Sequence, residues 1–398
     1  MHYVINSLLD TDLYKLTMHQ IVLHKFPGAY AKYRFKCRNN INLVPYKDEI
    51  EKEFDHLCTL QLNESEIQYL RTLPFLTDDY VDFMEDYRPK RRFIHVDITD
   101  GVLDIWFDGP ILQTMPFEIW VLRIVNEVYF RNIMRNSMLV YGNGTTRLYD
   151  KILTLNNYMN ENTTNVFKLV DFGTRRSFSG AWHKTVTNIL KNNLTKDVFV
   201  GTSNVLLAKE LNLTPIGTFA HEYVQIFQGL GICPIEDSQK VALQTWADEY
   251  RGELGICLSD TLGLNKFLKD FDLYFAKLYD GVRHDSGDPF YFADAIIEHY
   301  NNLGIDPKTK SIVFSDGLDV ELAIEIAEHC KNRINVSFGI GTNLTNDLGY
   351  EPLQIVIKMV ECGITKDDMR PVAKLSDSPG KTMCENDVYI NYLKDAIK

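Results

Sequence analysis

The stretch SIVFSDGLDVELAIEIAEHC, residues 311–330, sets the fold of this chain. Its first residues, SIVF, are β-branched and aromatic and predict a short strand. A polar turn follows, and apolar residues then recur at helical spacing up to Cys330. A strand, a polar turn and a helix in this order predict one β/α unit of a parallel sheet.

The same order recurs along the chain from about residue 165. The predicted strands are VFKLVDF (166–172), DVFVG (197–201), TPIGTF (214–219), LGICLSD (254–260), YDGVRHDSG (279–287), SIVFSDG (311–317) and INVSFGI (334–340). About seven such units predict an α/β fold, in the form of an irregular or incomplete β/α barrel. A doubly wound open sheet is the alternative.

The first 150 residues have a different pattern. AKYRFKCR (31–38) alternates as a half-buried strand does, and residues 91–107 read as a hairpin with Asp100-Gly101 at its turn. Residues 117–136 carry apolar side chains at helical spacing. We therefore predict an N-terminal α+β module over residues 1–150 and a barrel-like catalytic domain over 151–352. The segment 353–398 is expected to return to the N-terminal module.

Composition excludes several classes of protein. The 398 residues carry a net charge of −12, which disfavours binding to nucleic acid or to an anionic membrane surface. The seven cysteines include no Cys-x-x-Cys pair, so neither a disulfide framework nor a zinc site is expected. The N-terminal residues show no basic stretch followed by an apolar stretch, so we expect no secretory signal. No uncharged apolar run reaches about 18 residues, so we expect no membrane-spanning segment. We expect a cytoplasmic protein with no nucleic-acid and no membrane partner.

Polar residues collect where the predicted strands end. These segments are DFGTRR (171–176), GTSN (201–204), TFAH (218–221), SDT (259–261), RHDSGD (283–288), SDG (315–317) and GIGTN (339–343). The C-terminal edge of a parallel sheet is where ligands bind in barrels and open α/β sheets. Each Gly, Ser, Thr or Asp alone is expected to be a helix cap, but arginines and a histidine are not caps. The set predicts one shared active site.

The residue types indicate a phosphorylated ligand. Arg175, Arg176 and Arg283 offer planar donors for carboxylate or phosphate. The turns SDG and GIGTN resemble glycine-containing loops that bind phosphate through backbone N–H groups. Two lysines near the C-terminus, Lys374 and Lys381, are further candidate phosphate ligands.

Aspartates at the same edge are candidate magnesium ligands. Asp285, Asp288 and Asp316 can hold Mg²⁺ on a polyphosphate or contact ribose hydroxyls. The alternative is that they are turn and N-cap aspartates, and for Asp288 the two readings weigh equally.

Eight motifs in order resemble the nicotinate phosphoribosyltransferase family. They are TDLYKLTM (11–18), DFGTRRSFSGAW (171–182), GTSNVLLA (201–208), GTFAHEYVQ (217–225), SDTLG (259–263), GVRHDSGDP (281–289), FSDGLDV (314–320) and FGIGTNLTND (338–347). The resemblance implies an N-terminal α+β module packed on an irregular α/β barrel. It also implies formation of nicotinate mononucleotide and pyrophosphate from nicotinate and phosphoribosyl pyrophosphate, coupled to ATP hydrolysis through a phosphohistidine.

The resemblance assigns roles to single residues. His221 corresponds to the phosphorylated histidine, and Arg283 and Asp285 accompany it as catalytic residues. Phe172 resembles a ring that stacks on the pyridine, with Tyr14 on the other face, often donated by a second subunit of a homodimer. The remaining substrate contacts are Arg175, Ser203, Thr218, Asp316, Gly341, Thr342 and Asn343. Asp285 and Asp316 are the magnesium candidates.

One position bears on the choice of pyridine. Relatives specific for nicotinamide have an aspartate where this chain has Ser203. A serine carries no negative charge and tolerates the carboxylate of nicotinate, which favours the acid over the amide. Nicotinamide or quinolinate phosphoribosyltransferase is the nearest rival. A barrel aldolase or isomerase, or an idle nucleotide-binding regulator, would be a different class of protein.

Overall fold

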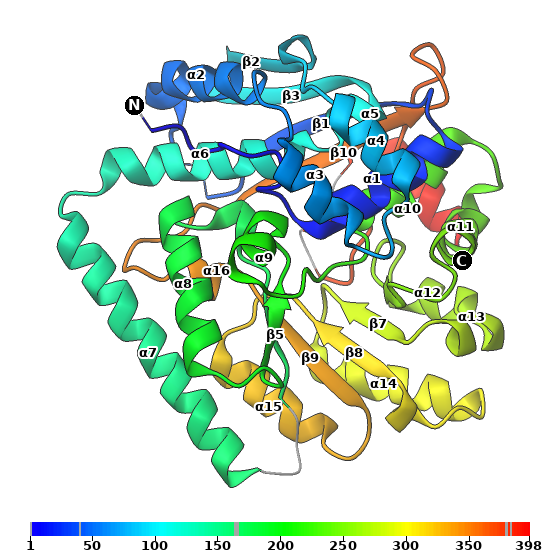
Figure 1. The fold of residues 1–398 in the computed structure, drawn as a ribbon. Helices are drawn as coiled ribbons and strands as arrows, with labels where there is room; N and C mark the ends of the chain where they lie inside the picture. The colour runs from blue at the N-terminus through cyan, green and yellow to red at the C-terminus, as the bar shows by residue number, and fades with distance from the viewer. Residues whose placement is uncertain (1, 40, 163–166, 379–380, 383) are drawn as a thin grey trace.

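A computed structural model describes residues 2–39, 41–162, 167–378, 381–382 and 384–398. Its framework is one antiparallel and one parallel sheet (Figure 1). The antiparallel strands, in spatial order, are β11 (Arg370–Pro371), β10 (Ile355–Gly363), β1 (Tyr30–Cys37), β3 (Val102–Pro110) and β2 (Ile94–Thr99). The parallel strands are β5 (Phe199–Thr202), β4 (Leu169–Asp171), β9 (Asn335–Ile340), β8 (Ser311–Phe314), β7 (Gly281–His284) and β6 (Ile256–Leu258).

The parallel sheet confirms the α/β fold class and shows where the barrel is incomplete. Six of the seven predicted β/α units supply a strand, whereas TPIGTF forms only an isolated bridge between Pro215 and Thr202. The segment still follows β5, because Ile216 N–H donates to the Thr202 carbonyl at 2.9 Å. The pairing ends after this one bridge, and Pro215, which has no N–H, cannot donate to a strand on the side away from β5. In the described residues β5 and β6 are therefore the two ends of the sheet.

The N-terminal elements follow their sequence pattern. β2 and β3 form the expected hairpin, and Asp100 (φ 52°) and Gly101 (φ 77°) supply the left-handed turn residues. The helices of this part are α1 (Leu13–Lys25), α2 (Lys47–Leu57), α3 (Glu64–Arg71), α4 (Asp78–Asp86), α5 (Ile111–Thr114) and α6 (Phe117–Ile133).

The remaining helices connect the parallel strands and cover the sheet. They are α7 (Ser137–Glu161), α8 (Gly180–Asn193), α9 (Val205–Leu211), α10 (His221–Leu230), α11 (Ser238–Tyr250), α12 (Leu264–Asp270), α13 (Leu273–Leu278), α14 (Pro289–Asn302), α15 (Val320–Cys330), α16 (Thr342–Thr345) and α17 (Asp387–Ala396). Asp288 accepts a hydrogen bond from the Tyr291 N–H at 2.7 Å, so this aspartate is the N-cap of α14.

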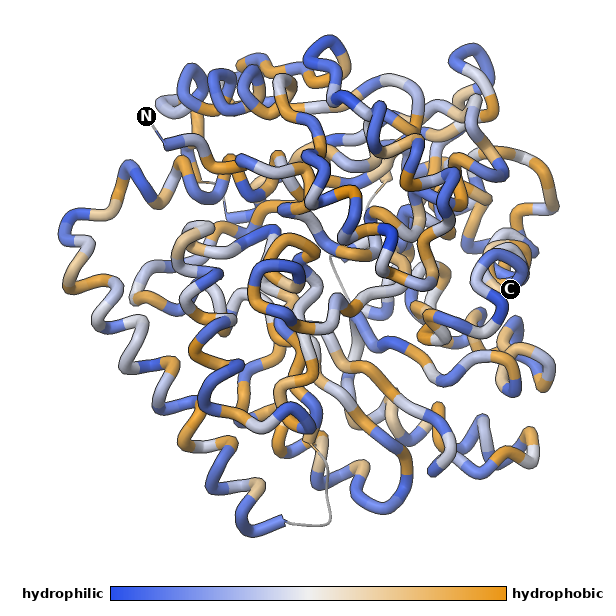
Figure 2. Tube along the Cα trace, in the orientation of Figure 1, coloured by the Kyte–Doolittle hydropathy of each residue, from blue (hydrophilic) through white to orange (hydrophobic). Residues whose placement is uncertain are grey.

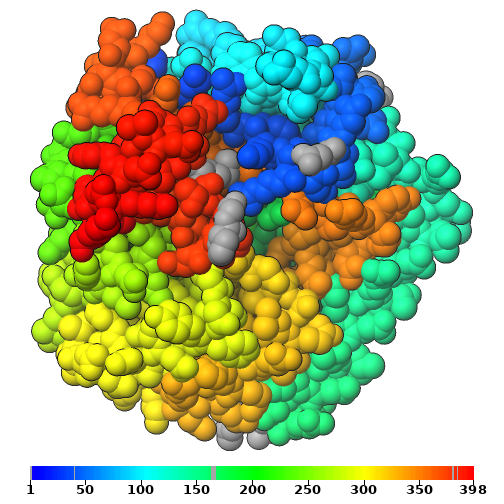
Figure 3. All heavy atoms as spheres, turned by 180° about the vertical axis from the view of Figure 1, so that it is seen from behind, coloured from blue at the N-terminus to red at the C-terminus, as the bar shows by residue number. Residues whose placement is uncertain are grey.

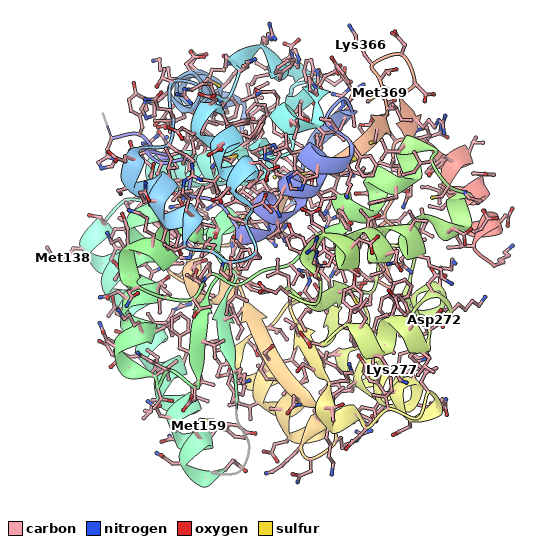
Figure 4. The ribbon with its side chains drawn as sticks, turned by 45° about the vertical axis from the view of Figure 1, so that its right-hand side comes forward. Met138, Met159, Asp272, Lys277, Lys366 and Met369 are labelled. Carbon is pink, nitrogen blue, oxygen red and sulfur yellow. The ribbon has the colours of Figure 1, made fainter. Side chains whose placement is uncertain are left out.

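Helix α7 runs along one side of the parallel sheet, with Met138 near its start and Met159 near its end (Figure 4). It packs against α8 and α15, and residue 150, the predicted domain boundary, lies inside it. Along the molecule, hydrophobic segments follow the sheet strands while hydrophilic ones gather in outer loops (Figure 2). No helix in the described part of the chain is both long and apolar enough to cross a membrane.

The C-terminal segment joins the two halves of the molecule. β10 pairs antiparallel with β1 of the N-terminal module, from Tyr30–Gly363 to Cys37–Ile355. Beyond it, a small apolar cluster seats Ala373, Leu375 and Leu393 against Leu262. Figure 3 shows this C-terminal segment in red, between the N-terminal module and the segments of the parallel sheet.

Candidate active site

A cavity of about 730 Å³ lies between the C-terminal ends of the parallel strands and the antiparallel sheet. Its volume falls in the range of small-molecule and cofactor sites. The residues singled out from the sequence that line it are Tyr14, Phe172, Arg175, Ser203, His221, Arg283, Asp285, Asp316, Gly341, Thr342 and Asn343. Loops far apart in the chain thus meet at one edge of the sheet.

His221 is the first residue of α10, and its side chain is buried. Its Nε2 lies 2.7 Å from Asp260 Oδ1, whereas Nδ1 has no hydrogen-bond partner among the described residues. Burial and the nearby Lys374 ammonium lower the pKa of His221 to about 4, so the ring is neutral at pH 7. A neutral ring that donates from Nε2 to a carboxylate carries its lone pair on Nδ1.

Asp260 is held on both oxygens. Oδ1 faces His221, and Oδ2 accepts from Lys374 Nζ at 2.8 Å and from Ser286 Oγ at 2.6 Å. Burial raises the pKa of Asp260, but His221 and Lys374 outweigh it and hold this pKa well below the ordinary value. The carboxylate therefore stays ionised and fixes the orientation of the imidazole.

Phe172 and Tyr14 bring two aromatic rings to the cavity. Phe172 follows β4, and its ring fits against Gly339 of β9, where an added Cβ would lie 2.2 Å from the Phe172 ring. The neighbouring Asp171 accepts hydrogen bonds from the Gly173 N–H at 2.8 Å and from His183 Nε2 at 2.6 Å, which fixes the turn. Tyr14 belongs to α1 of the same chain.

Cations concentrate along the cavity. Arg175 and Arg176 form the short turn that follows Phe172, and Arg283 is on β7. Lys358 reaches the cavity from β10 and has no ion pair or hydrogen bond from its ammonium among the described residues. Burial and the neighbouring Lys374 lower the pKa of Lys358 to about 8, and burial and Arg175 lower that of Arg176 to about 10. Such a group of cations is stabilised by an anionic ligand.

The two magnesium candidates are carboxylates at the ends of adjacent strands. Asp285 Oδ2 lies 3.4 Å from His221 Nε2 and 3.5 Å from Lys374 Nζ. Asp316 accepts from Lys381 Nζ through both oxygens, at 2.5 and 2.6 Å. Burial raises the pKa of Asp285, but Lys374 and His221 outweigh burial and bring this pKa down to about 2. Carboxylate oxygens are ligands that Mg²⁺ prefers, and both of these aspartates line the cavity.

The turn after β9 leads into α16. Gly341 precedes Thr342 and Asn343, and Lys151 donates to the Asn343 carbonyl from α7. The Asn343 side-chain oxygen is buried and has no hydrogen-bond partner among the described residues. An added Cβ at Gly341 would lie 2.9 Å from the Phe172 carbonyl oxygen, so the turn approaches the Phe172 backbone closely.

Two predicted substrate contacts, Thr218 and Ser203, have hydrogen-bond partners within the protein. Thr218 is not among the residues that line the cavity, and its carbonyl accepts from Thr17 Oγ1 at 2.7 Å. Ser203 lines the cavity but donates to Asp12 Oδ1 at 2.6 Å. Position 203 carries no carboxylate, but the carboxylate of Asp12 lies beside it. Burial raises the pKa of Asp12.

Sequence reasoning missed several residues of this site. Asp260 was visible in a strand-end motif, yet nothing in the sequence distinguished it from other aspartates near His221. Lys358 and Glu118 come from the antiparallel sheet and α6, where the rule for parallel strand ends does not apply. β10, IVIKMVECG, is a nearly continuous buried apolar run, and the lysine that interrupts it is the signal that was available.

Comparisons with known proteins agree with this geometry. Residues 167–398 match the model of the nicotinate phosphoribosyltransferase family, and residues 9–126 match that of its N-terminal domain. The chain belongs to this family.

Curated relatives span nearly the whole chain. A nicotinate phosphoribosyltransferase of Acinetobacter baylyi is 51% identical over 402 aligned positions, covering 99% of this chain and 97% of the relative. One of Ralstonia nicotianae is 49% identical and covers 98% of each. The crystal structure of a nicotinate phosphoribosyltransferase from Vibrio cholerae superposes with a TM-score of 0.92 at 38% identity, covering 99% of this chain and 94% of that one.

Proposed function

We propose that this protein forms nicotinate mononucleotide and pyrophosphate from nicotinate and phosphoribosyl pyrophosphate, as a step of NAD biosynthesis. The convergence of His221, Arg283 and the turn at 341–343 on one cavity carries the proposal. Aromatic rings suit a flat pyridine, and the cations suit a carboxylate and a diphosphate.

The transfer joins the pyridine nitrogen to the anomeric carbon. The C–N bond forms while the bond from that carbon to the pyrophosphate oxygen breaks, and the electron pair leaves with pyrophosphate. Negative charge grows on the leaving group, where Arg175 and Lys358 face the cavity. Catalysis is then mainly positioning and electrostatic stabilisation. Bound Mg²⁺, held by Asp285 and Asp316, would neutralise further charge on the phosphates.

ATP is proposed as a co-substrate that phosphorylates His221. Nδ1 attacks the γ-phosphorus, and the bond to the departing ADP oxygen breaks. The neutral ring and the Asp260 contact at Nε2 support Nδ1 as the nucleophile. A phosphoryl group adds about −1.5 to −2 charges, by analogy with other phosphorylated side chains, at a cavity lined by several cations. We infer that this charge reorganises the cations and tightens substrate binding.

The choice of pyridine is a separate part of the proposal. Nicotinate carries a carboxylate that Arg283 can neutralise, whereas nicotinamide does not. Pyrophosphate release should be measured with nicotinate, nicotinamide and quinolinate in turn, each with phosphoribosyl pyrophosphate, Mg²⁺ and ATP. Nicotinate should react much faster than the other two. Faster release with nicotinamide or quinolinate would assign the rival activity.

A further inference from the structure

A buried cluster of charges beside the cavity joins the N-terminal module to α10. Lys15 of α1 contacts Glu118 of α6 at 2.6 Å and also donates to Glu222 of α10. Tyr33 of β1 donates to the second oxygen of Glu222 at 3.0 Å. We call Lys15, Glu118, Glu222 and Tyr33 the buried charge cluster.

The cluster holds one ammonium and two carboxylates. The Lys15, Glu118 and Glu222 side chains are 1%, 9% and 6% exposed, so water screens their charges little. Lys15 pairs with both glutamates, which leaves one negative charge unmatched inside the cluster. Buried carboxylates in this position attract any cation nearby.

Two cavity cations, Lys358 and Arg175, act on Glu118, and of these Arg175 comes within ion-pair distance. Its Nη1 lies 3.8 Å from Glu118 Oε1, the oxygen that does not contact Lys15. This separation is an ion pair without a hydrogen bond. Arg175 is 33% exposed, so its guanidinium can turn toward a ligand in the cavity while Glu118 stays fixed by Lys15. Arg175 therefore has two competing partners, Glu118 and the ligand.

We propose that Glu118 is a positioning residue that holds Arg175 back and so limits the affinity of the site for the diphosphate of substrate and product. The inference rests on the proposed function, in which Arg175 faces that diphosphate. Weaker binding of pyrophosphate favours its release, which completes the reaction cycle.

Charge balance within the cluster gives opposite predictions for different variants. Glu118→Gln removes the competing carboxylate at constant size, and Glu222→Gln leaves Lys15 entirely to Glu118. Both should tighten binding of pyrophosphate. Lys15→Met leaves two uncompensated carboxylates that compete harder for Arg175, so it should weaken binding. Lys15→Met combined with Glu222→Gln leaves one unmatched negative charge, as in the wild type. The affinity of this double variant for pyrophosphate should therefore lie closer to that of the wild type.

Calorimetric titration with inorganic pyrophosphate at pH 8, together with steady-state kinetics, tests the inference. Glu118→Gln should bind pyrophosphate about twofold to fivefold more tightly, the range of one partly exposed ion pair. Its KM for phosphoribosyl pyrophosphate should fall while kcat does not rise. Glu127→Gln is the control, because Glu127 is a half-buried glutamate of the same helix but accepts from the Gly180 N–H and does not line the cavity.

Unchanged or weaker binding by Glu118→Gln would overturn the inference, as would a double variant no tighter than Lys15→Met. If Lys15→Met does not fold, the two glutamine variants decide, since both must bind more tightly than wild type. Failure of the wild type to bind pyrophosphate would instead contradict the proposed function.

Discussion

At the scale of single residues, the proposed phosphorylation depends on which nitrogen of His221 carries the free lone pair. Asp260 contacts Nε2 at 2.7 Å and is itself held by Lys374 and Ser286. This arrangement fixes the tautomer with the proton on Nε2 and leaves Nδ1 for the phosphoryl acceptor role. The orientation of the ring is therefore set by groups in the loops that follow β6 and β7 and in the C-terminal segment.

Asp260→Asn should reduce phosphorylation of His221 by about 100-fold or more. The asparagine amide can donate to Nε2 and favour the wrong tautomer, as in other carboxylate–histidine pairs. Rapid-quench labelling with γ-phosphate-labelled ATP measures the rate. Asp270→Asn, the same change at a buried aspartate of α12 bonded to Gln239, should label normally. Equal rates in Asp260→Asn and wild type would refute the role of Asp260.

The rate of His221 phosphorylation should fall less than about twofold between pH 7.5 and pH 5.5. With a pKa of about 4 the ring keeps its lone pair throughout this interval. A histidine with the ordinary pKa of about 6.5 would be about nine-tenths protonated at pH 5.5 and about tenfold slower. A single-turnover pH profile, corrected for the titration of ATP, distinguishes the two. Loss of rate centred near pH 6.5 would show that burial does not perturb this imidazole.

At the scale of elements, the end of β9 shapes the site of the aromatic ring. Gly339 lets the Phe172 ring lie against the strand, since any side chain there would overlap the ring. The next residues of the chain form the predicted phosphate turn. One strand end therefore positions both the Phe172 ring and the predicted phosphate turn.

Gly339→Ala should raise the KM for nicotinate about tenfold, with a smaller effect on the KM for phosphoribosyl pyrophosphate. The added methyl displaces the Phe172 ring, and a lost aromatic contact of this kind costs about 1–2 kcal/mol. Gly142→Ala is the control, because nothing lies within 4 Å of an added Cβ there. That change, inside α7, should leave KM unchanged and raise stability by about 0.5–1 kcal/mol in urea unfolding. An unchanged nicotinate KM in Gly339→Ala would mean that Phe172 does not contact the pyridine.

The elements also show how far local patterns predict this fold. The strands that precede a polar turn and an amphipathic helix formed as expected, because burial and helix capping act locally. The TPIGTF segment formed only one bridge, to Thr202 of β5, and Pro215 cannot donate to a strand on its other side. Asp260, Lys358 and Glu118 are brought to the cavity by pairing between distant segments, which no local pattern contains.

At the scale of the whole molecule, the site lies between two sheets that come from different parts of the chain. β10 returns from the C-terminal part to pair with β1 and carries Lys358 to the cavity. α10, which begins at His221, packs on the same strand. The N-terminal module is thus part of the active site, and supplies Tyr14 and Glu118 to it.

Mixing two inactive variants tests whether Tyr14 acts within its own chain. Tyr14 and Phe172 line the cavity of the same chain, so we expect both rings to act within one chain. A mixture of Tyr14→Ala and His221→Asn should therefore show only the sum of their separate activities. Recovery of about a quarter or more of wild-type activity in the mixture would show that Tyr14 is donated across a homodimer interface. Sedimentation at the assay concentration establishes which assemblies are present.

Mapping of the phosphorylated residue tests the central claim most directly. Wild-type protein is incubated with ATP, Mg²⁺, nicotinate and phosphoribosyl pyrophosphate, and nucleotide formation and acid-labile phosphate on the protein are followed together. We expect phosphate on Nδ1 of His221 during turnover, and neither this phosphate nor ATP stimulation in His221→Asn. ATP-stimulated turnover in His221→Asn, or phosphate on another residue, would contradict it.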